Sequence, residues 1–242
     1  MFIRNLNRLL RRLGLELHCY PGNLSMERAI ARAAKRNLAI STVIDVGASD
    51  GQWSRITQRY FATASYFLME ANPVHQQKLE SFKKQLAKID YVIAAAGDEV
   101  GKAYFDASDD FGGLASHTPT GGKMIEVPLT TIDVQVREKK LAPPFMIKLD
   151  THGFEVPIFN GAAQTLTQTN LIVVEAYNFK LTNSSLRFHE MCAFLEKKGF
   201  RCVDLCDPLF RPQDDALWQF DLFFIRDRRP EFSHNTYEIS AH

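Results

Sequence analysis

The most informative stretch of the sequence is VIDVGASDGQWS, residues 43–54. Its apolar run carries an acid, Asp45, and is followed by Gly47, Ala48 and Gly51. Glycine permits a tight turn from a strand into a helix and lets the backbone approach a ligand. A dinucleotide site would show the spacing GxGxxG, and a carboxylate beside the turn would repel a pyrophosphate. The spacing D-x-G-x-x-x-G instead favours S-adenosylmethionine, which carries an ammonium and a sulfonium group but no phosphate.

A second apolar run, SYFLMEANP, ends at Glu70, which lies 70 − 51 = 19 residues after Gly51. An acid at the end of the second strand of a nucleoside-binding sheet forms hydrogen bonds with ribose hydroxyls. Asn72 and Pro73 then begin a helix, because proline is tolerated in a first turn. The two segments together predict a nucleoside cofactor.

Acids recur at the ends of other predicted strands, at Asp98, Asp150 and Glu175. Because open α/β sheets bind ligands beyond the carboxyl ends of their strands, we expect these side chains to share one site. His152 follows Asp150 and either accepts a proton from a substrate hydroxyl or only shapes the start of a helix. Asp150 and Glu175 offer oxygen ligands to a hard cation, but their spacing does not require one, and we predict no metal. Lys148 is expected to neutralise a neighbouring carboxylate.

These residues are positioned by an alternation of strands and helices that begins near residue 41. It predicts a Rossmann-like, doubly wound, mainly parallel seven-stranded sheet with an antiparallel last strand, preceded by N-terminal helices. The predicted strands are Thr42 to Val46, Ser65 to Glu70, Asp90 to Ala95, Phe145 to Asp150, Leu171 to Ala176, Phe200 to Leu205 and Leu217 to Ile225. The predicted helices between them are Trp53 to Phe61, Pro73 to Ala87, Ile132 to Lys139, Glu155 to Thr167 and Ser184 to Lys198.

Residues 97–130 interrupt this alternation with a Gly-rich insertion. Two short strands, Lys102 to Phe105 and Ile125 to Leu129, are expected in it, and an insertion of this length is commonly a lid or a substrate loop. His117 lies in it and either reaches the substrate or stays in solvent. The predicted organisation is therefore a helical extension (1–40), a catalytic domain (41–226) and a tail (227–242).

Composition and the N-terminus narrow the class of protein. The 242 residues are 45% apolar and 24% charged with a net charge of +1, which is typical of a globular protein and favours no nucleic-acid partner. Residues 2–17 form a Leu/Arg amphipathic pattern that suits packing, self-association or contact with a membrane surface. The sequence contains neither an 18-residue apolar run nor a signal-peptide pattern, so we expect a cytoplasmic protein, with peripheral contact at the inner face of the membrane as an alternative.

The chain resembles the FkbM family of methyltransferases. The match is carried by VIDVGASDGQWS, FLMEANP, AAAGDEVGKAYF, IKLDTHGFEVPIFNGAAQTL and IVVEAYN, over roughly residues 41–180. The resemblance implies cofactor contacts and a reaction side. The implied cofactor residues are Asp45, Gly47, Ala48, Gly51, Glu70, Asn72, Ala95, Ala96, Asp98 and Asp150. The implied residues of the reaction side are Asp150, His152, Gly153, Glu155 and Glu175.

The sequence departs from the family at His152, where the family commonly has Glu or Gln. We predict an S-adenosylmethionine-dependent O-methyltransferase with His152 and Asp150 as catalytic residues and His117, Glu155 and Glu175 near the substrate. The acceptor would be a hydroxyl of a sugar, a glycan or glycolipid, or a natural product. A non-catalytic module that binds S-adenosylmethionine or a nucleoside, and a nicotinamide-dependent oxidoreductase, are the alternatives.

Overall fold

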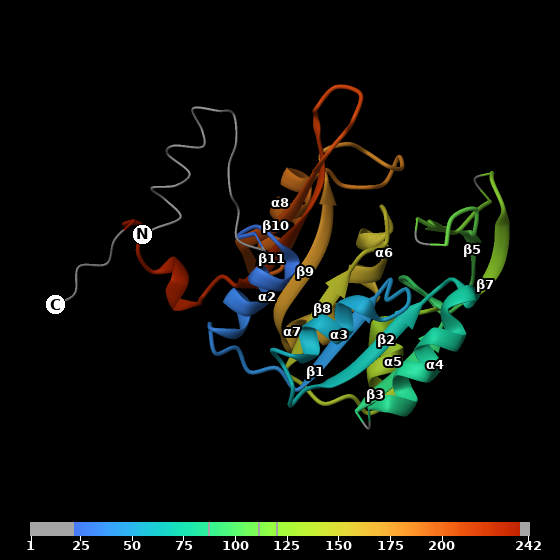
Figure 1. Ribbon diagram of the computed structural model, residues 1–242, viewed down its shortest axis with the longest axis horizontal. Coiled ribbons are helices and arrows are strands. Elements are labelled where there is room, and N and C mark those ends of the chain that lie inside the picture. Colours follow the sequence, from blue (N-terminus) through green and yellow to red (C-terminus); the bar gives the residue numbers. More distant parts are fainter. Residues whose placement is uncertain (1–21, 87, 111, 120, 238–242) are drawn as a thin grey trace.

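The computed structural model describes residues 22–86, 88–110, 112–119 and 121–237, and its centre is a seven-stranded sheet (Figure 1). Strands β9, β8, β1, β2 and β3 are parallel to one another, and β11 lies antiparallel between β9 and β10. The predicted doubly wound sheet with an antiparallel last strand is therefore confirmed. In spatial order the strands are β10 (Phe200–Phe210), β11 (Leu217–Arg226), β9 (Thr169–Tyr177), β8 (Phe145–Leu149), β1 (Thr42–Val46), β2 (Ser65–Glu70) and β3 (Ile89–Ile93).

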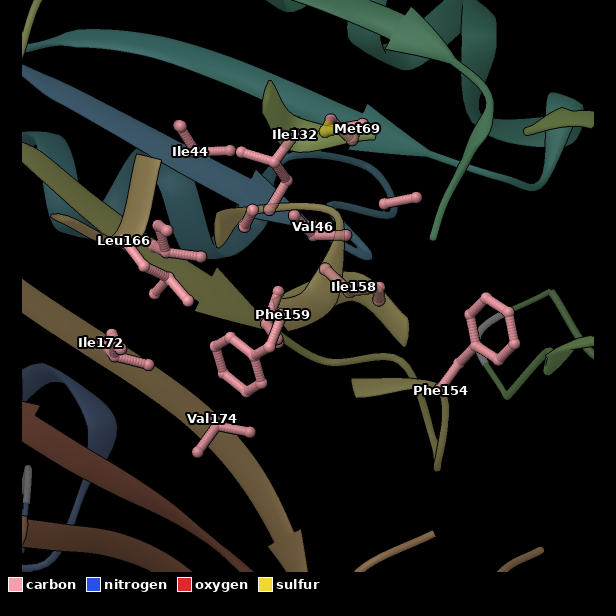
Figure 2. Close-up of a cluster of buried hydrophobic side chains, with 14 of the residues drawn as sticks. Ile44, Val46, Met69, Ile132, Phe154, Ile158, Phe159, Leu166, Ile172 and Val174 are labelled. Carbon is pink, nitrogen blue, oxygen red and sulfur yellow. The ribbon is translucent and has the colours of Figure 1, made fainter. Parts of the chain in front are cut away.

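Helices cover both faces of this sheet (Figure 1), because its central strands are apolar on both sides. On β1, Val43 packs toward α2 (Met26–Ala34), α3 (Gln52–Gln58) and α4 (Gln76–Gln85). Ile44 and Val46 face the opposite core, which Figure 2 shows with Ile158, Phe159 and Leu166. The helices on that side are α5 (Ile132–Glu138), α6 (Glu155–Asn160), α7 (Ala163–Thr167) and α8 (Phe188–Glu196).

The Gly-rich insertion forms a second, four-stranded sheet. Both strands expected in it are confirmed, as β5 (Gly101–Asp106) and β7 (Met124–Thr130), and β5 is antiparallel to β7. The single strand predicted from Asp90 to Ala95 is wrong, because β3 ends at Ile93 and Ala95 belongs to β4 (Ala95–Ala96), which precedes the insertion and pairs with β7 in this second sheet. The short strand β6 (Ala115–Ser116) completes the sheet and was not predicted. Its inward side chains, such as Phe105 and Leu129, join the core that Figure 2 shows, where Phe154 stands apart from the other labelled residues.

The prediction of one helix over residues 155–167 is wrong, because the chain breaks there into α6 and α7. The break occurs at Gly161, where a Cβ atom would lie 1.9 Å from the carbonyl oxygen of Gly97. The Gly161 carbonyl also accepts a hydrogen bond from the Asp133 N–H, at 3.0 Å. Contact with the segment that enters the second sheet therefore interrupts the helix.

The two ends of the described chain pack on the same part of the molecule. Ser25 caps α2 by accepting from the Arg28 N–H. Arg229, just before the short helix η3 (Pro230–Phe232), donates to the Arg36 carbonyl at 2.9 Å. The predicted helix over residues 2–17 lies outside the described residues. In the part of the chain that is described, no helix is both long and apolar enough to cross a membrane.

Candidate active site

A cavity of about 310 Å³ opens at the carboxyl edge of the main sheet. The ends of β1, β2, β8 and β9 form its floor, and residues of the insertion form part of its wall. Seven of the residues predicted from the sequence line it together. They are Gly47, Glu70, Ala95, Ala96, Asp150, His152 and Glu175.

The turn after β1 fits tightly against the turn after β8. Gly47 has φ +71°, and a Cβ atom there would lie 1.9 Å from the Asp150 carbonyl oxygen. Only glycine combines this left-handed conformation with so close an approach. Ser49 follows with φ 51° and donates its backbone N–H to Glu70 Oε2 at 2.6 Å. The turn is thus held between two strand ends.

Glu70 is fixed by backbone donors on both carboxylate oxygens. Besides the Ser49 contact, its Oε1 accepts from the Asn72 N–H at 2.7 Å. Burial raises the pKa of Glu70, and the two backbone N–H groups partly oppose this. Each carboxylate oxygen accepts more than one hydrogen bond, so Glu70 can hold the turn and still accept from a ligand hydroxyl in the cavity.

Substituting Glu70 by Gln should weaken binding of S-adenosylhomocysteine about 10- to 100-fold, because one backbone N–H then faces an amide N–H₂ and a charge-assisted acceptor is lost. Isothermal titration calorimetry measures this. Since the pKa of Glu70 is raised, wild-type affinity should also fall as the pH drops, beginning at a higher pH than for an exposed glutamate. Glu80→Gln is the matched control, because Glu80 accepts from Tyr91 Oη outside the cavity lining. An unchanged Kd in Glu70→Gln would restrict this residue to a structural role.

A buried ion-pair row lies beneath the cavity. Lys148 Nζ is 3.4 Å from Asp45 Oδ1 and 3.3 Å from Asp150 Oδ2, which confirms the expectation that Lys148 neutralises a carboxylate. Burial alone would lower the pKa of Lys148, but the charges of Asp150 and Asp45 outweigh it and raise that pKa. Burial likewise opposes ionisation of Asp150, whose pKa is nevertheless lowered by Lys148 and His152. Asp150 therefore presents an ionised carboxylate to the cavity.

His152 is held in an uncommon backbone conformation, with φ 53°. A non-glycine residue in this region costs about 1–3 kcal/mol and persists only where its surroundings enforce it. Glu155 helps to do so, because its buried Oε1 accepts from the Gly153 N–H at 2.8 Å and from Thr151 Oγ1 at 3.2 Å. The turn directs the imidazole into the cavity lining, next to Asp150.

The imidazole of His152 contacts β9 rather than Asp150 at hydrogen-bond distance. Its Nδ1 lies 2.7 Å from Tyr177 Oη and 3.3 Å from Glu175 Oε2, whereas Nε2 lies 3.9 Å from Asp150 Oδ1. Tyr177 donates its O–H to Glu175 Oε2, and Gln219 donates to Glu175 Oε1. Burial, and then the charge of Glu175, raise the pKa of Tyr177. This hydroxyl therefore stays a donor.

Two groups of described side chains could hold a metal ion by distance alone. In the first, one ligand atom from each of Asp150, His152 and Glu175 lies within 4.8 Å of the others. Both Glu175 oxygens already accept hydrogen bonds from Tyr177 and Gln219, so the contacts favour a hydrogen-bonded network there. The second group is Cys206, Asp207 and Asp221, and none of these residues lines the cavity.

The insertion closes part of the cavity through two sets of contacts. His75, in the short helix η2 (Pro73–His75), places Nε2 2.7 Å from the Asp110 carbonyl oxygen, and Asn72 Nδ2 donates to the same oxygen at 3.5 Å. His117 Nε2 lies 3.3 Å from Asp98 Oδ1, and the imidazole ring packs on the ring of Phe154. Residues far apart in the sequence are thus brought together at the rim.

Eight other predicted site residues lie outside the cavity lining, and their direct contact with a ligand stays a prediction. Three of them brace the framework. The Asp45 carboxylate is fully buried and accepts from Ser54 Oγ at 2.7 Å, Gly51 begins α3 against Phe82, and Asn72 caps η2. The remaining five are Ala48, Asp98, His117, Gly153 and Glu155.

Several lining residues were not predicted from the sequence. His75 falls in the predicted helix Pro73 to Ala87 and was not predicted as a site residue, yet it lines the cavity. Ser49 and Phe154 also line it, and each neighbours a predicted site residue, Ala48 or Gly153. Tyr177 contacts His152 because β8 and β9 pair in parallel, with Leu149 opposite Val174 at the end of the pairing that leads to the cavity. For Ser49 and Phe154, the only signal in the sequence was a position shortly after the end of a strand. Such a position brings a side chain near the cavity whatever its chemical type.

The chemistry of the lining fits the cofactor that the glycine turn predicts. Glu70, Asp150 and Glu175 bring carboxylates to the cavity, and no Lys or Arg is among the lining residues that the structure describes. Carboxylates suit a ligand with a sulfonium and an ammonium group, whereas the pyrophosphate of a dinucleotide would meet acids without a cation. Glu70 also stands where an acid takes ribose hydroxyls.

Solved structures with similar folds include several methyltransferases, each with 7–13% sequence identity. One is a precorrin-6y C5,15-methyltransferase from Geobacter metallireducens GS-15, with 13% identity over 87% of this chain and 93% of that chain and a TM-score of 0.44. Another is M. capricolum TrmK in complex with S-adenosylhomocysteine, with 7% identity over 83% of this chain and 69% of that chain and a TM-score of 0.48. A third is M. jannaschii TYW2 in complex with AdoMet, with 12% identity over 84% of this chain and 77% of that chain and a TM-score of 0.44. No curated protein matches the chain.

The doubly wound sheet and the cavity at its carboxyl edge define a Rossmann-like α/β domain of the nucleoside-binding class. The model of the methyltransferase FkbM domain matches residues 45–202, which is most of the chain. The chain therefore belongs to the FkbM methyltransferase family, and its cofactor is S-adenosylmethionine.

Proposed function

We propose that this methyltransferase transfers a methyl group to a hydroxyl oxygen of an uncharged acceptor. The candidate acceptors are a sugar, a glycan or glycolipid, and a hydroxylated natural product. The observation that carries the proposal is the imidazole of His152, which lines the same cavity as Glu70 and Asp150. A hydroxyl is a weak nucleophile, so its methylation profits from a base placed beside the reacting oxygen.

Three parts of the cavity would act on the two substrates. Glu70 and the Gly47 turn would hold the nucleoside part of the cofactor, and Asp150 would attract its positive charge. When bound, S-adenosylmethionine supplies the methyl group and leaves as S-adenosylhomocysteine. His152 would take the proton of the acceptor hydroxyl as the new oxygen–carbon bond forms, so that no free alkoxide is needed. Holding both substrates in the cavity supplies much of the remaining rate.

The charge of the lining favours a neutral acceptor over a phosphorylated one. The described lining residues include the acids Glu70, Asp110, Asp150 and Glu175 and no Lys or Arg, and Lys148 beneath the cavity pairs with Asp150. An anionic acceptor would therefore enter a lining with more acidic than basic side chains, whereas sugar hydroxyls can donate to the same oxygens. Nucleic acid is disfavoured for the same reason.

The test combines binding with a screen for transfer. Calorimetry should show binding of S-adenosylmethionine and S-adenosylhomocysteine but not of NAD. Methyl-labelled S-adenosylmethionine should then label neutral glycans, glycolipids or polyols, in an alkali-stable ether bond, rather than phosphosugars or RNA. Label on nitrogen or on RNA would contradict the proposal. Cofactor binding without transfer to any member of the panel would favour a non-catalytic module.

Removal of divalent metal should leave methyl transfer unchanged, because both oxygens of Glu175 are used within the protein. The measurement compares initial rates, with an acceptor found in the screen, before and after dialysis against EDTA. A loss of activity that Mg²⁺ or Mn²⁺ restores would show instead that the Asp150, His152 and Glu175 cluster works as a metal centre.

A further inference from the structure

We propose that Tyr177 and Glu175 are positioning residues that hold His152 in its Nδ1–H tautomer and thereby leave Nε2 as the atom that takes the acceptor's proton. The inference rests on the proposed function and deepens it by assigning two residues of β9. Neither residue needs to touch the acceptor for this role.

The tautomer follows from counting hydrogens. Tyr177 has one O–H, and it points to Glu175 Oε2. Its oxygen can therefore only accept from His152 Nδ1, 2.7 Å away. The other atom near Nδ1 is Glu175 Oε2 at 3.3 Å, which accepts the Tyr177 O–H. Nδ1 must carry the hydrogen, so the neutral ring has its lone pair on Nε2.

The rest of the network keeps these acceptors in place. Gln219 lies opposite Tyr177 in the β9–β11 pairing and donates to Glu175 Oε1. Tyr177 and Glu175 are 5% and 8% exposed, so water competes little for these bonds. Asp221, opposite Glu175 on β11, has its pKa raised well above the usual range by burial and by the charge of Glu175.

The arrangement also suits the charged form of the base. Once Nε2 has taken a proton, the imidazolium has a buried carboxylate 3.3 Å from its Nδ1. An ion pair in a poorly hydrated site stabilises that charge more than water would allow. Asp150 lies on the other side of the ring, 3.9 Å from Nε2, and is engaged by Lys148. Orientation therefore comes from β9.

The tautomer of His152 can be determined by NMR without knowing the methyl acceptor. The probe is the full chain, labelled with ¹⁵N-histidine, bound to S-adenosylhomocysteine and recorded at alkaline pH, where imidazoles are neutral. His152→Gln assigns the resonance. We expect the Nδ1–H pattern for wild-type His152, and a shift toward Nε2–H in Glu175→Gln and Tyr177→Phe. Tyr91→Phe is the control, because it removes a hydroxyl that donates to Glu80 at 3.0 Å.

Either of two results would overturn the inference: an Nε2–H ring in the wild type, or a ring pattern that neither variant changes. With an identified acceptor, Glu175→Gln should lower kcat about 10-fold or more and leave the acceptor KM unchanged. A purely structural role would instead disturb binding and thermal stability together. The proposed function fails separately, if His152→Gln keeps full turnover although the wild-type ring is Nδ1–H.

Discussion

Substitution of His152 by Gln should lower kcat for methyl transfer about 10²- to 10⁴-fold, which is the usual contribution of a positioned general base. The amide of Gln can form hydrogen bonds with Tyr177 and Glu175 but cannot take up a proton. Binding of S-adenosylhomocysteine should stay within a few-fold of wild type, since the cofactor contacts belong to Gly47 and Glu70. Single-turnover rates and calorimetry on the same preparation separate the two effects.

Two histidine variants serve as references for this result. His234→Gln changes an exposed side chain and should be silent. His75→Gln removes the contact with the Asp110 carbonyl, so we expect a weaker hold on the insertion and a higher KM rather than a loss of proton transfer. Full turnover in His152→Gln combined with a collapse of kcat in His75→Gln would show that His152 is not the base.

Substitution of Gly47 by Ala should destabilise the fold by about 3 kcal/mol or more and abolish cofactor binding. The new methyl group would lie 1.9 Å from the Asp150 carbonyl oxygen, in a backbone conformation with φ +71°. Relief requires the β1 and β8 turns to separate, and both turns line the cavity. Thermal unfolding should show a drop of roughly 6–12 °C.

Substitutions at two other glycines distinguish backbone strain at a positive φ from the steric clash of an added Cβ atom. Gly121 has φ +108° but nothing within 4 Å of an added Cβ, so Gly121→Ala reports backbone strain alone. Gly101 has open space and no positive φ, so Gly101→Ala should leave stability unchanged. If Gly47→Ala and Gly121→Ala lower the melting temperature equally, the close approach to Asp150 is not what requires glycine at residue 47.

Much of the main sheet could be predicted because its strands are fixed by local patterns. The predicted bounds of β1 and β2 match the structure, since each is a continuous apolar run that stops at a turn signal. The helix break at Gly161 could not be predicted, because it depends on a contact with Gly97, far away in the sequence. Strands β4 and β6 have two residues each, too few to show a period.

The candidate site was predictable where position after a strand decides it. Glu70, Asp150 and Glu175 share the cavity because parallel strands end at one edge. Tyr177 and Gln219 could not be found this way, because their contacts with Glu175 depend on the pairing register of β9 with β11. Asp45 shows the opposite case: its place near the glycine turn suggested a ligand contact, yet its side chain is buried beneath Lys148.

The second sheet has a consequence for how such an enzyme can change its acceptor. Strands β4 to β7 pair among themselves, and the segment still contributes Phe105, Asp110, Gly113 and Ala115 to the cavity wall. The cofactor turn and the proton-handling residues lie on the main sheet, outside this segment. Under the proposed function this wall would contact the acceptor, so we expect that recognition of the acceptor and the chemistry of transfer can diverge independently during evolution. Residues 105–115 are the natural place for a directed library aimed at new acceptors.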